Sequence, residues 1–443
     1  MKSKSITVIC CLIAAVFLFS GCSLLDFFAA EALLRAPKLT GENAALQEAF
    51  ENSVGKDVSL FTPIAGDYRA SYIFFDANGD NSDEAVVFYA LNTNLSVIHI
   101  HLLARNGEEW YSVADITGSG TNVYKVDFFN IDTDGVLEVA VTWTVDDSKK
   151  EKTLSIYRIT GFAKDGSNSL ASVATVQMAD YIYLDIDSDK VNELLYFYHN
   201  SSADSNQMGA RLLEYSSGAD TLQPVSDISL NERISSLLQI VYDRLGDDCA
   251  VYVDCLLSDG DYYTEIIYYD KELAVMSLPQ DENGLICTVT ERDAGKLCED
   301  FNRDGQIDIP VSLYSENSYT TGRPEGVKEQ IGFVSWQTYI NGKLSEIGKY
   351  YDNAVDGYLI NIDTLFDYYY FVYDYSAHVT QVRIKNFDEE NNIVFTVKYD
   401  NKNDNFGNFT STDMEDKYII SVTSKGKEMG ISDIFVENLI INR

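Results

Sequence analysis

The chain has 443 residues, with 33 Lys or Arg against 69 Asp or Glu, so its formal net charge is −36. We therefore expect no nucleic-acid partner, because binding one needs a basic surface. Disorder is excluded as well, since hydrophobic residues make up 46% of the chain and aromatic residues 12%, which is enough apolar surface for a core.

The chain begins with an export signal. Lys2 and Lys4 precede an apolar run from Ile6 to Phe19, shorter than the ~20 residues of a membrane-spanning helix. Such a run predicts a signal peptide over residues 1–21. Ser20-Gly21-Cys22 resembles the bacterial lipobox, whose Cys is diacylated and becomes the new N-terminus, although Phe19 stands where that pattern prefers Leu. The alternative is an ordinary signal peptide in which Cys22 is incidental.

Cleavage before Cys22 defines the rest of the chain. The mature protein keeps 31 basic and 69 acidic residues, a net charge of −38, and anionic lipid headgroups repel so acidic a surface. The lipid on Cys22 is therefore expected to hold a monomer at the outer, extracellular face of the bacterial cell membrane. Residues 22–39 read as a tether and residues 40–443 as the folded domain.

A short helix is expected next, and strands after it. Thr40 can cap the helix, apolar residues from Leu46 to Val54 share one face, and Gly55 can end it. Between residues 85 and 129, four short runs rich in Val, Ile, Tyr and Phe are separated by polar turns, a pattern typical of strands.

An acidic motif recurs along the chain. Each of four copies has Asp or Asn at positions 1, 3 and 5, an acid at position 9, and then an apolar strand. The sixteen residues are Asp76, Asn78, Asp80 and Glu84; Asn130, Asp132, Asp134 and Glu138; Asp185, Asp187, Asp189 and Glu193; Asp300, Asn302, Asp304 and Asp308. The copies begin at 76, 130, 185 and 300, and the last gap is close to two of the earlier steps.

The doubled gap predicts a degenerate copy near 243. Asp243 and Asp247 are present there, but Leu245 and Val251 replace ligand residues, and a fainter copy includes Asp352 and Asp356. Four strands in each step of ~55 residues indicate an all-β fold, a β-propeller of four-stranded blades. Residues 38–443 divided by that step give about seven blades, with six or eight also possible, and a terminal strand is expected to close the ring on the first blade.

The motif suits calcium. Three oxygen-bearing side chains at alternating positions converge in a tight turn, and the acid at position 9 can reach back to them. Ca²⁺ takes six to eight oxygen ligands at ~2.3–2.6 Å. An EF-hand would need its Glu at position 12, and a simple Asx turn does not require an acid at position 9. Gly135 and Gly305 stand at position 6, where a sharp turn favours glycine. Asn81 and Lys190 hold that position in the other two loops; Asn tolerates the turn, whereas Lys190 makes the third loop a weaker match.

These residues carry a resemblance. The D-x-[DN]-x-D-G-x-x-[DE] loop before a strand, once per blade, resembles the FG-GAP or VCBS repeat of integrin α subunits and bacterial surface proteins. The resemblance covers about 70–370 and rests on the loop and its period, since the FG-GAP half of the motif is mostly missing. It implies that the sixteen residues hold metal at one rim of the ring and that ligands meet the other rim.

Other candidates for chemistry are weaker. His99 and His101 share a strand face without an evident third ligand, and Ser53-Val-Gly-Lys56 matches an S-x-x-K string without its companion motifs. The tyrosines at 262–263 and 366–375 suit the core better than a binding surface. Cys249, Cys255, Cys287 and Cys298 allow disulfides or free thiols equally.

The sequence thus favours a calcium-binding surface lipoprotein that binds or scaffolds an unknown protein or glycan. No catalytic constellation is identifiable, so we do not expect an enzyme. The alternatives are an enzyme acting on polysaccharide, with its site in the propeller channel, and an assembly factor for a membrane complex.

Overall fold

The structure is a computed structural model, and it describes residues 42–145, 151–164, 169–200, 207–245, 248–275, 290–293, 295–327, 330–340, 343–385, 392–399 and 418–442. The predicted signal peptide, Cys22 and the tether lie outside these residues, as do Asp247 and Cys287. The described part is almost entirely β-structure with three short helices, so the all-β prediction is confirmed. None of these helices is long and apolar enough to cross a membrane.

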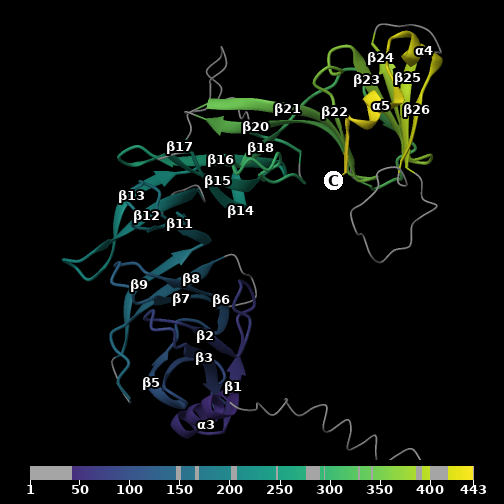
Figure 1. Cartoon of the computed structure of the whole chain (residues 1–443). Coiled ribbons are helices and arrows are strands. Elements are labelled where there is room, and N and C mark those ends of the chain that lie inside the picture. The colour runs from purple at the N-terminus through teal and green to yellow at the C-terminus, as the bar shows by residue number, and fades with distance from the viewer. Residues whose placement is uncertain are drawn as a thin grey trace, which may run out of the picture. The chain divides into compact units, whose positions relative to one another are not determined.

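The chain divides into two compact units. Unit 1 extends to Thr175 and unit 2 starts at Val176, except that residues 131–133 and 150–152 group with unit 2. Among the described residues, unit 1 has one helix and two antiparallel sheets, and unit 2 has four sheets and two short helices. Figure 1 shows the sheets following one another in chain order within each unit.

The described part of unit 1 begins with helix α3, which spans Glu42–Val54 as predicted. Leu46 and Phe50 of the helix are buried against the first sheet, and Gly55 ends the helix with a φ of +88°. The first sheet contains β1 (Val58–Phe61), β2 (Tyr72–Phe75), β3 (Glu84–Leu91), β4 (His99–Asn106) and β5 (Glu109–Thr117). The second contains β6 (Asn122–Phe129), β7 (Glu138–Thr144), β8 (Lys152–Ile159) and β9 (Leu170–Met178).

Unit 2 continues with two four-stranded sheets and two five-stranded ones. The third sheet is β10 (Asp180–Leu184), β11 (Glu193–His199), β12 (Met208–Ser216) and β13 (Thr221–Ser229). The fourth is β14 (Ile234–Leu245), β15 (Asp248–Leu257), β16 (Tyr262–Tyr269) and β17 (Leu273–Val275). The fifth is β18 (Asp308–Ser312), β20 (Ile331–Ile340), β21 (Lys343–Asn353), β22 (Tyr358–Asn361) and β27 (Ile440–Asn442).

The sixth sheet is β19 (Tyr319–Thr321), β23 (Tyr369–Asp374), β24 (Val379–Ile384), β25 (Ile393–Tyr399) and β26 (Tyr418–Val422), followed by helices α4 (Ser424–Glu428) and α5 (Asp433–Glu437). The last two sheets exchange strands. Strand β19 leaves the fifth sheet to pair with β23 in parallel, and the C-terminal β27 returns to pair with β22. The exchange ties the end of the chain to the fifth sheet.

Neighbouring sheets within a unit share apolar cores. One core joins the first and second sheets, and three more join the third to the fourth, the fourth to the fifth and the fifth to the sixth. Strands β3, β7 and β11 are buried on both faces over most of their length, and helix α3 covers the second face of β3. This face-to-face packing explains why their sequences do not alternate between apolar and polar residues.

The blade prediction is confirmed only in its coarser form. Repeated four-stranded antiparallel sheets are present, but the described residues form six sheets, and seven blades are not confirmed. The expected closure differs as well. Among the described strands, β1 pairs with β3 and β27 pairs with β22, so neither terminal strand joins the first sheet to the last.

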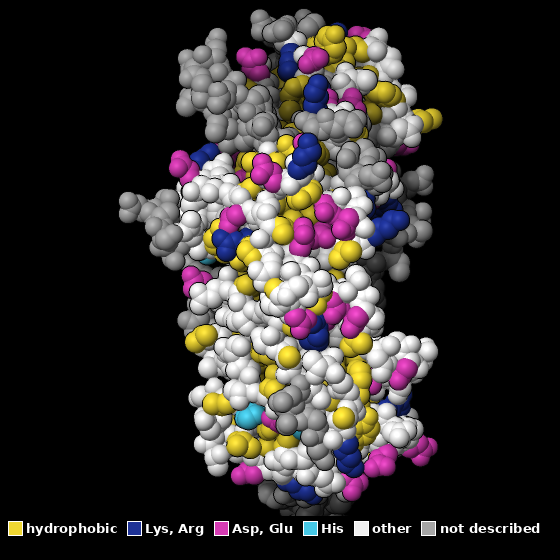
Figure 2. Space-filling view, turned by 90° about the vertical axis from the view of Figure 1, so that its left-hand side faces the viewer, with side chains coloured by type: hydrophobic (Ala, Val, Ile, Leu, Met, Phe, Trp, Pro, Cys, Tyr) yellow, Lys and Arg dark blue, Asp and Glu magenta, His cyan; other side chains and the backbone are white. Residues whose placement is uncertain are grey.

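Acidic side chains are spread over the surface. Figure 2 shows Asp and Glu side chains scattered over one face, and in the whole chain Asp and Glu outnumber Lys and Arg by 69 to 33.

The described cysteines lie in the interior. Cys249, Cys255 and Cys298 are buried free thiols, so the described cysteines form no disulfide. Burial raises the pKa of each of these thiols, which keeps them protonated and unreactive.

Candidate metal centre

The four acidic loops occupy equivalent places in their sheets. Each joins a segment at the edge of its sheet to the strand beside it, and the residue before the loop pairs with the acid at position 9. The pairs are Phe75 with Glu84, Phe129 with Glu138, Leu184 with Glu193 and Glu299 with Asp308. The repeat found in the sequence is therefore a structural repeat as well.

All four loops share one backbone conformation. Positions 4 and 6 both have a φ between +60° and +91°, the left-handed region that favours glycine. The position-4 residues are Gly79, Thr133, Ser188 and Arg303, and the position-6 residues are Asn81, Gly135, Lys190 and Gly305. The sequence signalled the turn at position 6 but not the one at position 4. Lys190 adopts the conformation, with a φ of +77°, although its side chain disfavours it.

The acidic side chains shape these turns through backbone hydrogen bonds. In every loop the N–H of position 6 donates to the side-chain oxygen of position 1, at 2.9–3.4 Å. In every loop the N–H of position 7 donates to Oδ1 of position 5, at 2.7–2.9 Å. Each carboxylate oxygen has two lone pairs, so an oxygen that accepts one N–H can still bind a cation.

The acid at position 9 is buried in every loop. Glu84, Glu138, Glu193 and Asp308 are each at most 3% exposed. In three loops this carboxylate accepts the N–H of position 2: Ala77 to Glu84 at 3.0 Å, Ile186 to Glu193 at 2.9 Å and Phe301 to Asp308 at 3.1 Å. Position 9 thus anchors the loop to the core and places a carboxylate beneath it.

Burying these acids beside other carboxylates changes their protonation. Burial, together with nearby loop carboxylates, raises the pKa of Glu193 to about 8 and that of Glu84 to about 7. Burial likewise raises the pKa of Asp187 and Asp308. A cation among these groups would reverse the effect, because it stabilises the ionised form.

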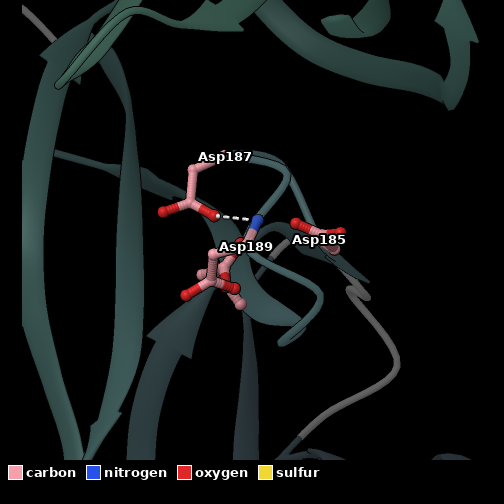
Figure 3. A group of neighbouring side chains, drawn as sticks. Asp185, Asp187 and Asp189 are labelled. Carbon is pink, nitrogen blue, oxygen red and sulfur yellow. Dashed lines mark hydrogen bonds between the residues drawn. The ribbon is translucent and has the colours of Figure 1, made fainter. Parts of the chain in front are cut away.

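The 185–193 loop has the geometry of a metal site. Oxygens of Asp185, Asp187, Asp189 and Glu193 all lie within 4.8 Å of one another. Oxygens that share one Ca²⁺ are separated by at most ~5 Å, twice the usual bond length. Figure 3 shows the three aspartates around the turn, with the N–H of Asp189 donating to Asp187 Oδ1 at 3.1 Å. Asp185 Oδ1 is buried and has no hydrogen-bond partner, so an oxygen is left for a cation.

A guanidinium from the fourth sheet also contacts this loop. Arg244 of β14 lies 3.3 Å from Asp185 Oδ2, donates to Ser188 Oγ at 3.0 Å and donates to the carbonyl oxygen of Asp185. It neutralises one edge of the loop, and within the described part of the chain no basic side chain pairs with Asp187, Asp189 or Glu193. This contact could not be predicted from the sequence, because 59 residues separate Arg244 from Asp185.

The other three loops bring fewer free carboxylates together. In the 130–138 loop, Glu138 already pairs with Arg158, whose Nε lies 3.3 Å from its Oε1. In the 300–308 loop, Asp308 accepts from Thr338 at 2.6 Å as well as from Phe301, and the amide of Asn302 donates to Asp304 at 2.9 Å. Among the described residues, the 185–193 loop is the one of the four whose acids converge within 4.8 Å.

The degenerate copies have other roles. Asp243 lies in β14 and accepts the N–H of Ile307 at 2.7 Å, so it supports the 300–308 loop. A similar contact occurs in unit 1, where Leu137 donates to the carbonyl of Ala77 at 2.7 Å. Successive loops of a unit therefore meet at one edge of its sheets. Asp352 instead lies in β21 and Asp356 in the turn that follows it, and the β21–β22 hairpin is not the first hairpin of its sheet.

The structure also places the weaker candidates. The tyrosine-rich segments are mainly core, since Tyr263, Phe371 and Tyr373 are each 1% exposed. A second acidic group, Asp259, Asp261 and Glu291, is already bridged by Arg233, which donates to Glu291 at 2.8 Å and 3.0 Å and also to Asp259. His99 and His101 both contact Asp115, a partner that the sequence did not reveal.

Comparison with known proteins does not assign a family. No family model and no curated protein matches the chain. Among solved structures, the Bacillus licheniformis rhamnogalacturonan lyase PL11 is 12% identical with a TM-score of 0.28, over 65% of this chain and 64% of the lyase. A protein from Lactobacillus plantarum is 11% identical with a TM-score of 0.25, over 69% of this chain and 78% of that one. The match spans less than two thirds of the lyase, and both TM-scores are too low to support an argument.

Proposed function

We propose that this chain is a calcium-binding β-propeller lipoprotein of the FG-GAP or VCBS type, anchored to the outer face of a bacterial membrane through Cys22. In this proposal it is a binding or scaffold module for a protein or glycan ligand. The observation that carries it is the convergence of four acidic oxygens in the 185–193 loop, within 4.8 Å. The orphaned Oδ1 of Asp185 supports the same proposal.

The physical role of the metal follows from the loop's position. Four carboxylates that converge at the rim of two packed sheets repel one another. A divalent cation removes that repulsion and fixes the hairpin between β10 and β11. Binding to the folded state alone stabilises it by about 2.7 kcal/mol when the free ion is at 100 times its Kd. Calcium would thus stiffen the module and leave the rest of its surface free for a ligand.

Calorimetric titration of the purified full-length chain with Ca²⁺, after treatment with EGTA, tests the metal. We expect saturable binding, and Asp187→Ala, which removes the oxygen ligand altogether, should remove one site. Glu214→Ala is the matched control, because burial and then the carboxylates of Asp187 and Asp189 raise the pKa of Glu214, although it is not one of the converging acids. Absence of binding, or equal loss in both variants, would contradict the proposal.

The anchor needs a separate test. Cells that express the full chain in the presence of a labelled fatty acid should incorporate the label, and Cys22→Ser should abolish incorporation. Mass spectrometry of the N-terminus then distinguishes a diacylated Cys22 from an ordinary signal-peptide cleavage. If Cys22 is unmodified, the proposed lipid anchor is wrong, whereas the calcium proposal is unaffected.

A further inference from the structure

A serine, a histidine and an aspartate form a chain of hydrogen bonds in unit 1. Ser53 Oγ lies 3.1 Å from His101 Nε2, and His101 Nδ1 lies 2.7 Å from Asp115 Oδ2. Both distances fall in the range expected of a nucleophile, its base and the group that orients the base. These residues lie 48 and 14 positions apart, on three different elements.

The fold explains why the three groups meet. His101 on β4 and Asp115 on β5 are direct cross-strand partners, so their side chains are neighbours on one face of the first sheet. Helix α3 packs on that face through Leu46 and Phe50, and the ring of Phe50 contacts the ring of His101 edge-on at 5.5 Å. Ser53 stands in the last turn of this helix, directly above the histidine.

The hydrogen-bonding capacity of each group fixes the protons. An ionised carboxylate can only accept, so the Nδ1 of His101 carries the proton that faces Asp115. In the neutral imidazole Nε2 is then an acceptor, and the hydroxyl of Ser53 must donate to it. The same hydroxyl can donate instead to the carbonyl of Phe50 at 2.8 Å, which is its resting alternative.

Asp115 is held firmly in this role. It also accepts from the hydroxyl of Tyr89 at 2.6 Å and contacts His99 Nδ1 at 3.0 Å. These hydrogen bonds, against the opposing effect of partial burial, lower the pKa of Asp115 and keep it ionised. His101 is 1% exposed, whereas Ser53 is exposed and can be reached from solvent. The neighbouring Gly55 has open space around its Cα, with no atom within 4 Å of an added Cβ.

We propose that Ser53, His101 and Asp115 form a nucleophilic triad that accepts an acyl group from a neutral carboxylic ester. Ser53 Oγ attacks the carbonyl carbon and forms a C–O bond while its proton passes to His101 Nε2. The ester C–O bond then breaks, and the leaving alcohol takes that proton from His101. Water releases the acid by the same two steps. A neutral ester fits best, because the net charge of −36 repels anions.

A covalent probe tests the triad directly. The full-length chain is treated with a fluorophosphonate, which transfers its phosphonyl group to an activated serine as fluoride leaves, and the labelled peptide is identified by mass spectrometry. Labelling stops at the phosphonylated serine, so it reports on an activated nucleophile without requiring turnover of an ester. We expect the label on Ser53, its loss in Ser53→Ala, and a fall of about 100-fold in labelling rate in His101→Gln.

Matched variants distinguish a Ser53 that is activated as a nucleophile from a Ser53 that only helps to hold helix α3 on the sheet. Ser59→Ala removes another serine of the first sheet, whose hydroxyl donates to Asn92 at 2.7 Å, and should leave labelling unchanged. If His101→Gln fails to fold, Ser53→Cys and Ser59→Cys are compared instead: iodoacetamide should alkylate the first at least 10-fold faster. Labelling of Ser53 no greater than that of Ser59, or equal alkylation rates, would overturn the proposal and leave Ser53 a structural contact.

Discussion

The 185–193 loop and the residues around Asp243 occupy corresponding places in successive sheets, yet they became different structures. The first is a nine-residue turn that gathers four acids. The second is a tight hairpin in which Leu245 pairs with Asp248. Its Arg244 contacts the 185–193 loop, and its Asp243 contacts the 300–308 loop. Where the ligand pattern is incomplete, the hairpin thus connects two neighbouring acidic loops instead of gathering its own acids. The comparison predicts that a cation, either a metal or a guanidinium, is needed at this edge of the sheets.

The largest effect is expected from Glu193→Ala. The substitution removes a carboxylate of the candidate site and leaves the buried N–H of Ile186 without its 2.9 Å acceptor. We expect the free energy of unfolding in saturating Ca²⁺ to fall by about 3 kcal/mol, from an unmade buried hydrogen bond and weakened ion binding. Urea unfolding with Ca²⁺ and with EGTA measures both parts. An equal loss in the two conditions would show that Glu193 is structural only.

The next effect is a pH dependence that calcium removes. The pKa of Glu193 is about 8 in the folded chain against an ordinary value of 4.5, so between these values the folded state binds the extra proton. Stability without metal should therefore fall as pH rises through this range, by at most about 1.4 kcal/mol per pH unit. Bound Ca²⁺ keeps the carboxylate ionised and should flatten the slope. Unfolding curves from pH 5 to 8 with EGTA and with Ca²⁺ test this, and parallel curves would count against it.

A smaller effect is expected from Arg244→Ala. The variant leaves the acidic loop without its guanidinium, and because Arg244 is about a third exposed we expect a loss of about 1 kcal/mol in EGTA. Calcium should restore most of that loss, since it supplies the missing positive charge. Arg211→Ala is the control, because Arg211 pairs with Asp227 of its own sheet at similar exposure and its loss should not respond to calcium.

The smallest effect concerns the backbone of the same loop. Lys190 has a φ of +77°, and Lys190→Gly should relieve about 0.5–1 kcal/mol of strain. Lys190→Gln is the matched control, because it removes the same charge but keeps the Cβ. The difference in unfolding free energy between the two variants, measured in saturating Ca²⁺, gives the cost of holding a residue with a Cβ at this positive φ. No difference would mean that side-chain contacts of Lys190 compensate for its conformation.

Much of the fold could be predicted because its signals are local. Helix α3, the strands between residues 84 and 129 and the hairpin position of all four loops follow from patterns a few residues long. The exchange of β19 and β27 between the last two sheets could not be predicted, since those strands are three residues long and their partners are distant in sequence. Position 4 of the loops was missed because Thr133, Ser188 and Arg303 are not glycines.

The sequence by itself determined the acidic hairpins, their period and the oxygen ligands that they offer, because spacing along a short turn places those groups together. Only the tertiary structure decided which hairpin gathers its carboxylates, through Arg244 at one loop and Arg158 and Thr338 at others. The same holds for Ser53, His101 and Asp115, which a helix and two strands bring within hydrogen-bond distance. Contacts across sheets depend on packing, and packing leaves no periodic trace in the sequence.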